Sequence, residues 1–204
     1  GSFETLLGVK SCITGTKLVI GIGTGCNAAL ALTTDTGVTV PASETGHIAM
    51  PVRNQSDLDL VLFLRQTHGF ASVEHVLSGS GLENLYCWHA RHAPQSPPIS
   101  AQKIIAAMAD RSDPAAVQAV QSATQILAHL CADLALIHLP FGGVYLVGGV
   151  ARALAPYLSE FGFDTNFQDM GRYKAFMSRF SISLVTDDYA ALTGCAKVIA
   201  SVPR

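Results

Sequence analysis

A carboxylate and an imidazole stand three residues apart in the segment SETGHI, residues 43–48. Glu44 and His47 flank Thr-Gly between two apolar stretches, where a plain turn between strands requires neither group. A carboxylate accepts hydrogen bonds and an imidazole donates or accepts them, so hydrogen bonding is the chemistry open to this pair. Glu74 lies so far along the chain that only the fold can bring it to them. Residue types alone place both glutamates at the surface, since glutamate is rarely buried unless it is paired.

Two groups of glycines stand where strands are expected to end. Gly23 and Gly25 flank Thr24, and the N–H groups of such a turn, with the threonine hydroxyl, can hold phosphate oxygens. The segment is not a dinucleotide fingerprint, because a strand and not a helix is expected to follow it, and alone it favours a β-turn. Gly148 and Gly149 end a second strand and open a helix. Ligands collect at that edge of open α/β sheets, although such a pair serves packing at least as often.

The elements that must position these residues follow from apolar periodicity and turn residues. Ser56 is expected to cap the first helix and Gly69 to end it, Gly79 and Gly81 are expected to interrupt the second, and Pro114 suits the first position of the longest. Strands are expected in 17–25, 27–34, 37–42, 143–149 and 180–187, and helices in 56–69, 72–92, 96–112, 113–139, 150–162 and 189–201. The order βββ, several helices, then β-α-β-α predicts one mixed-sheet α/β domain.

Composition narrows the classes of partner. A chain of 204 residues can bury about 70% of its unfolded surface, so it needs no metal or disulfide to fold. The net charge of −2 and the lack of a basic run argue against nucleic acid and anionic membranes. The five cysteines, without a C-x-x-C pair, indicate reduced thiols and a cytoplasmic location. The longest uncharged run, 114–132, is too polar for a membrane span.

Several segments together resemble one protein family. They are GTG followed by a strand, ETGH, SVEHVLSGSGLENLY and FGGVYLVGGV, with GRYKAF and DDYAALTGCA near the end. In this order, from about residue 18 to about residue 198, they resemble the large C-terminal domain of bacterial ATP-dependent glucokinase. The resemblance implies an actin-like ATPase (ribonuclease H-like) domain, a mixed sheet with helices on both faces. It also implies a two-domain protein with glucose and ATP in the cleft between the domains.

The resemblance assigns a role to the polar residues of the opening motif. Glu44 and His47 match the family's E-x-G-H, and Glu74 matches the glutamate that precedes V-L-S-G. In the family these three side chains hold glucose hydroxyls, each of which is both donor and acceptor. The three residues are therefore the expected substrate-binding set.

The resemblance also implies a site for ATP with Mg²⁺. The matching residues of the phosphate loop and of the adenosine side are Gly23, Thr24, Gly25, Gly148 and Gly149. After G-T-G the family usually continues with Leu-Gly, whereas Cys26 and Asn27 stand here. Asparagine tolerates a left-handed backbone, so the loop can keep its shape, but the departure leaves open whether it still contacts ATP.

The resemblance places the catalytic base outside this sequence. The family's N-terminal domain carries an Asp-Gly-Gly-x-Thr-Asn loop and an Asn-Asp pair whose aspartate is the base, and neither string occurs here. We therefore expect the C-terminal domain of an enzyme that phosphorylates glucose at the 6-hydroxyl, inactive or nearly so alone and commonly a homodimer. Residues 1–17 are expected to be a cloning remnant and a lead-in from the missing domain, and 18–204 the domain itself. The pair Asp187-Asp188 is expected to be a turn and not a substitute base.

Three other interpretations have less support. A sugar-responsive regulator would carry a basic recognition helix, which this sequence lacks. A zinc site at Cys87, His89 and His92 has no second ligand cluster at a recognised spacing, so no metal site is expected. A degenerate glucokinase-like protein that binds or senses a sugar stays possible because of Cys26 and Asn27.

Overall fold

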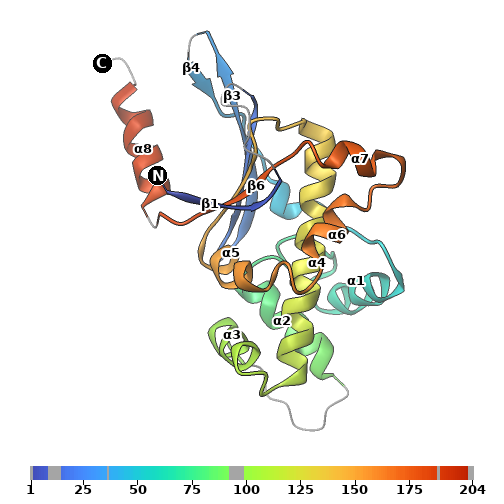
Figure 1. The fold of residues 1–204 in the computed structure, drawn as a ribbon. Helices are drawn as coiled ribbons and strands as arrows, with labels where there is room; N and C mark the ends of the chain where they lie inside the picture. Colours follow the sequence, from blue (N-terminus) through green and yellow to red (C-terminus); the bar gives the residue numbers. More distant parts are fainter. Residues whose placement is uncertain (1, 9–14, 36, 92–98, 188, 202–204) are drawn as a thin grey trace.

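A six-stranded mixed sheet organises the chain (Figure 1). Residues 2–8, 15–35, 37–91, 99–187 and 189–201 are described in a computed structural model. The strands are β1 Phe3–Leu7, β2 Lys17–Ile22, β3 Cys26–Thr34, β4 Gly37–Thr39, β5 Val144–Val147 and β6 Ile182–Val185. Their spatial order is β1-β6-β5-β2-β3-β4, in which β2, β5 and β6 are parallel and the outer strands antiparallel. The predicted mixed sheet is confirmed.

Helices lie on both sides of the sheet. The α-helices are α1 Gln55–His68, α2 Gly79–Ala90, α3 Ala101–Ala109, α4 Pro114–His138, α5 Gly149–Leu154, α6 Phe163–Gln168, α7 Lys174–Met177 and α8 Ala190–Ser201. Short 3-10 helices span η1 Thr45–His47, η2 Ala155–Tyr157 and η3 Gly171–Tyr173. In Figure 1, α4, α6 and α7 lie on one side of the sheet and α8 lies on the other. Helix α8 is exposed at Leu192 and Ile199 and does not cover its side.

The long helix α4 forms the centre of the core. Asp113 caps it by accepting a hydrogen bond from Ala115 N at 2.8 Å, and Pro114 occupies the first turn as predicted. It packs against α2, α3 and α6. By length and a mean hydropathy of 1.3, α4 could cross a membrane, but 67% of that stretch is buried inside the fold. Side chains such as Leu127 and Leu130 each contribute about 1.5–3 kcal/mol by burial, which is what a core helix supplies.

Helix α1 begins one residue earlier than its expected cap. Asn54, and not Ser56, accepts a hydrogen bond from Asp57 N at 3.0 Å, while the Asp57 carboxylate accepts one from Asn54 N at 3.2 Å. This reciprocal capping box satisfies two backbone donors, which one serine would not. Gly69 ends the helix with a φ of +72°, as predicted.

The second predicted helix starts where it was expected to break. Residues 72–78 form a loop, because Ser72 bridges to Ala49 and Glu74 N bonds to Gly46 O, so the segment is committed to tertiary contacts. Ser78 Oγ then accepts a hydrogen bond from Gly81 N at 2.9 Å and caps α2. The prediction of a helix from residue 72 was therefore wrong for its first turns.

Two further differences concern segments 3–7 and 150–162. The residues expected to be a lead-in contribute strand β1, which pairs antiparallel with β6. In place of the single helix expected over 150–162, α5 ends at Leu154, η2 follows it, and residues 158–162 form a turn before α6. Pro156 lies within η2, and Gly162, whose φ is +74°, precedes the first residue of α6.

Candidate functional site

Three loops meet beyond the end of β2, and hydrogen bonds join them. Glu74 N donates to Gly46 O at 2.9 Å, and Cys26 N donates to Glu74 Oε2 at 2.8 Å. Gly79 N donates to Gly23 O at 2.8 Å, which ties the start of α2 to the turn after β2. The structure thus brings the E-x-G-H segment, the glycine turn and the V-L-S-G segment to one place.

Two glycines make this close approach possible. A Cβ on Gly46 would lie 1.9 Å from the backbone oxygen of Cys26, and one on Gly25 would lie 2.6 Å from Glu74 Oε2. Any side chain on Gly46 would push the loops apart, whereas one on Gly25 would displace the Glu74 carboxylate. Among the described residues, Glu74 Oε1 has no hydrogen-bond partner, so this half-buried carboxylate keeps one oxygen for a ligand.

Two of the predicted substrate-binding residues flank Gly46 of this junction. Glu44 and His47 lie at the two ends of η1, with His47 Nε2 4.0 Å from Glu44 Oε2. Their side chains are 81% and 67% exposed, so they face solvent and are open to a ligand. Gly46, which lies between them, is the residue that bonds to Glu74.

A histidine that the sequence did not single out lies beside this group. The ring of His75 stacks on that of His68 with centroids 4.1 Å apart, and its Nδ1 accepts a hydrogen bond from Ser72 N at 3.2 Å. Burial, followed by the nearby His68, lowers the pKa of His75, while Glu74 opposes this and His47 adds to it. In the sequence, only its position next to Glu74 indicated that His75 could lie near the site.

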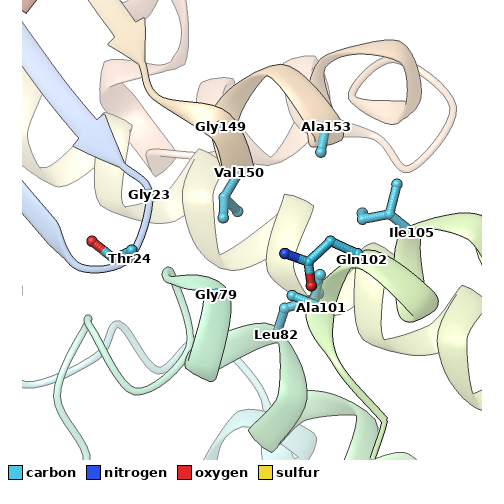
Figure 2. A pocket seen from close by; sticks show the side chains of 10 residues that line it. All are labelled: Gly23, Thr24, Gly79, Leu82, Ala101, Gln102, Ile105, Gly149, Val150 and Ala153. Atoms are coloured by element: carbon cyan, nitrogen blue, oxygen red, sulfur yellow. The ribbon is translucent and has the colours of Figure 1, made fainter.

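A pocket of about 570 Å³ opens next to the glycine turn (Figure 2), within the size range of small-molecule sites. Figure 2 shows Thr24 on the turn after β2, Val150 and Ala153 on α5, and Gln102 and Ile105 on α3. Its walls are largely apolar, with the Gln102 amide extending toward Val150. The α3 wall carried no recognisable motif and was missed in the sequence.

The five residues expected at the nucleotide divide into two kinds. Gly23, Thr24 and Gly149 line the pocket. Gly25 lies against Glu74, and Gly148, with a φ of +111°, would place a Cβ 2.3 Å from the backbone oxygen of Ile22. These two glycines permit close packing against Glu74 and Ile22 and are not among the residues that line the pocket.

The residues weighed for zinc have other partners. His89 Nε2 lies 2.9 Å from Ser122 Oγ, and burial, with a smaller effect of Arg91, lowers the pKa of His89 to about 4. Burial raises the pKa of the Cys87 thiol, whereas His92 lies outside the described residues. The described part of the chain contains no group of three His, Cys, Asp or Glu side chains that could hold a metal ion.

The pair considered as a substitute base lies in a turn as far as it is described. Asp187 Oδ1 accepts a hydrogen bond from Tyr189 N at 2.9 Å, and Asp188 is outside the described residues. Nothing in this geometry connects Asp187 to the pocket.

Similarity to known proteins identifies the family. A family model described as glucokinase matches residues 2–202. The chain belongs to the glucokinase family. Marinobacter nauticus glucokinase is 32% identical over 184 residues, which cover 90% of this chain and 57% of that protein. Brucella abortus glucokinase is 34% identical over 181 residues, which cover 88% of this chain and 52% of that protein. This glucokinase-family chain spans about half the length of the curated relatives it matches.

Solved structures agree with the fold. A glucokinase from an Antarctic psychrotroph has a TM-score of 0.88 at 25% identity, covering 98% of this chain and 62% of its own. A Balamuthia mandrillaris glucokinase in complex with glucose has a TM-score of 0.80 at 21% identity, covering 91% and 55%. A ROK-family glucokinase from Streptomyces griseus, in complex with glucose and AMPPNP, has a TM-score of 0.54 at 18% identity, covering 81% and 59%. The predicted actin-like ATPase fold of this glucokinase-family chain is confirmed.

Proposed function

We propose that this chain supplies the sugar clamp and one wall of the nucleotide site to an enzyme that phosphorylates the 6-hydroxyl of glucose with ATP. The observation that carries the proposal is the hydrogen bond from Glu74 N to Gly46 O, because it holds Glu74 beside the segment bearing Glu44 and His47. Two carboxylates and an imidazole suit adjacent hydroxyls, each a donor and an acceptor. A site that pairs with individual hydroxyls also rejects analogues that lack them.

The pocket beside the clamp suits ATP. Its apolar walls, to which Leu82, Ile105 and Val150 contribute, fit the base and ribose. Thr24 offers its N–H and hydroxyl groups to phosphates, whereas Gly23 N already donates to Gly25 O at 2.9 Å. ATP supplies the phosphoryl group and Mg²⁺ neutralises charge on the phosphates. Because the described residues contain no cluster of metal ligands, we propose that Mg²⁺ arrives on the nucleotide.

The transfer needs a base that we do not assign to this chain. The 6-hydroxyl oxygen bonds to the γ-phosphorus, the bond to ADP breaks, and the hydroxyl proton passes to a carboxylate. We propose that this carboxylate lies on an N-terminal domain of the same protein, so the 204-residue chain alone should be inactive. Glucose-dependent ADP release by the purified chain, abolished in Glu74→Gln, would contradict this.

The location, the pathway and the oligomeric state of the enzyme are also proposals. We infer a cytoplasmic, glycolytic enzyme that forms a homodimer. The charged fraction of only 14% supports a surface covered by a partner. Light scattering of the chain at high concentration tests the dimer, and a monomer there would count against it.

Glucose binding is the decisive experiment. Saturation-transfer NMR of the chain with glucose should show binding, which Glu74→Gln and His47→Ala should weaken by about tenfold or more, as expected from losing hydrogen bonds to charged groups. Glu160→Gln is the matched control, because Glu160 pairs with Arg111 away from the site. The proposal fails if the wild-type chain shows no saturation transfer to glucose, or if all three variants bind it equally well.

A further inference from the structure

Asn27 holds the backbone on both sides of Glu44. Its Nδ2 donates a hydrogen bond to Ser43 O at 2.6 Å, and its Oδ1 accepts one from Thr45 N at 2.9 Å. The same Oδ1 also accepts from Ala28 N at 2.8 Å, which fixes the amide against β3. Glu44 is therefore the residue between the two peptide groups that Asn27 binds.

The bonding pattern requires an amide of this length. Thr45 N can only donate and Ser43 O can only accept, so the orientation of the Asn27 amide is set by its partners. An aspartate would keep an acceptor for Thr45 N but would turn a second acceptor toward Ser43 O. An alanine or glycine would offer neither group.

The same loop is held on its other side by the V-L-S-G segment. Glu74 N donates to Gly46 O at 2.9 Å and Val73 N donates to Ile48 O at 3.0 Å. The first two residues of β3 thus hold both glutamates in different ways. Cys26 N donates to the Glu74 carboxylate, and the Asn27 amide binds the backbone on both sides of Glu44. Asn27 does not line the nucleotide pocket.

From this geometry we propose that Asn27 is a positioning residue that orients Glu44 and His47 toward Glu74 and so sets glucose affinity without affecting the nucleotide. The inference rests on the proposed sugar site. This role explains Asn27, which stands where the family usually has glycine. The replacement would then affect glucose binding and not ATP binding.

The first test reads the loop directly and does not depend on the sugar. Hydrogen exchange measured by NMR on the 204-residue chain should show the Thr45 amide exchanging about tenfold faster in Asn27→Ala, because its acceptor is gone. In Asn27→Asp the acceptor remains, so Thr45 should stay protected. Asn54→Ala is the matched control, since it removes a comparable bond at the start of α1. Equal Thr45 exchange in wild type and Asn27→Ala would overturn the inference.

The second test reads the ligands. Asn27→Ala should weaken glucose binding about tenfold in an NMR titration, Asn27→Asp should weaken it less, and AMPPNP binding should change less than twofold in both. Faster exchange at Thr45 with unchanged glucose affinity would overturn the positioning role, as would an equal loss of glucose and AMPPNP. A wild-type chain that binds no glucose refutes the proposed function and the glucose part of this inference together, whereas the exchange result still decides whether Asn27 holds the loop.

Discussion

The sugar side and the nucleotide side of the site meet at the glycine turn after β2, but different interactions shape them. The sugar side is a junction of three loops joined by hydrogen bonds of 2.8–2.9 Å around Glu74, Gly46 and Cys26. The nucleotide side is an open pocket with largely apolar walls from α2, α3 and α5. A junction of directional bonds tolerates little displacement, whereas an apolar wall tolerates changes that keep its volume.

The glycines show the same contrast. On the sugar side, a Cβ on Gly46 would overlap the backbone oxygen of Cys26, an atom that cannot move without shifting β3. On the nucleotide side, a Cβ on Gly23 or Gly149 would meet nothing within 4 Å. Alanine in place of Gly46 and alanine in place of Gly149 therefore distinguish the two sides.

Gly46→Ala should have the largest effect. Separating the loops to admit a Cβ breaks the bond from Glu74 N, so glucose binding should fall about 100-fold and the free energy of unfolding by about 1–3 kcal/mol. Gly149→Ala is the control, and it should leave stability unchanged or raise it by up to about 1 kcal/mol, since alanine favours a helix. Thermal unfolding and NMR titration check both variants. If Gly46→Ala retained wild-type glucose affinity, the loop junction would not be the sugar site.

Val150→Trp should produce the converse result. An indole projecting from α5 would fill part of the pocket, so AMPPNP binding should weaken about tenfold or more while glucose binding stays within about twofold. Isothermal titration with each ligand measures the two effects. Val150→Ile is the matched control, because it adds only one methylene. Equal weakening of both ligands by Val150→Trp would show that the two sides do not act independently.

The two sides also differ in how much of them could be predicted. The elements around the pocket follow from local patterns: Pro114 and Asp113 mark the start of α4, and Gly148–Gly149 the end of β5. The α3 wall carries no motif, because its contribution to the pocket comes from apolar side chains that also occur in ordinary core helices. The position of Gly79 at the start of α2 could not be inferred, because the apolar spacing of the preceding residues imitates a helix.

On the sugar side the residue types were recognisable from the family resemblance, but their connections were not. The bond from Cys26 N to Glu74 depends on the register of β2 with β3, in which Ile22 pairs with Cys26, and on the path of a distant loop. The sequence marks Asn27 only as a departure from the family pattern. Its side-chain bonds to residues 43 and 45 follow from the tertiary fold and not from its neighbours in sequence.

Lowering the pH should weaken glucose binding but not nucleotide binding, and this effect should be smaller than those of the substitutions above. The pKa of His75 is lowered, so the ring stays neutral at neutral pH and accepts the bond from Ser72 N. As the pH falls through the lowered pKa, the ring gains a charge and loses that acceptor, which should loosen the 72–78 loop and weaken glucose binding about two- to fivefold. Because the unfolded chain binds this proton at higher pH, the stability that the neutral ring contributes is present above about pH 6.5 and is lost on acidification. Among the described residues that line the pocket, none carries a titratable side chain, so their contribution to nucleotide binding should not change.

Titrations with glucose from pH 7.5 to pH 5 measure this effect, and a matched variant identifies its source. His68→Gln removes the stacked ring that helps to lower the pKa of His75, so the loss of glucose affinity should begin at a higher pH than in wild type. His89→Gln is the control, because His89 bonds to Ser122 of α4 and its pKa of about 4 lies below the titrated range, so the profile should stay unchanged. If the profiles of wild type and His68→Gln coincided, the pH dependence would not arise from His75. The loss of glucose affinity on acidification would then come from another group of the junction.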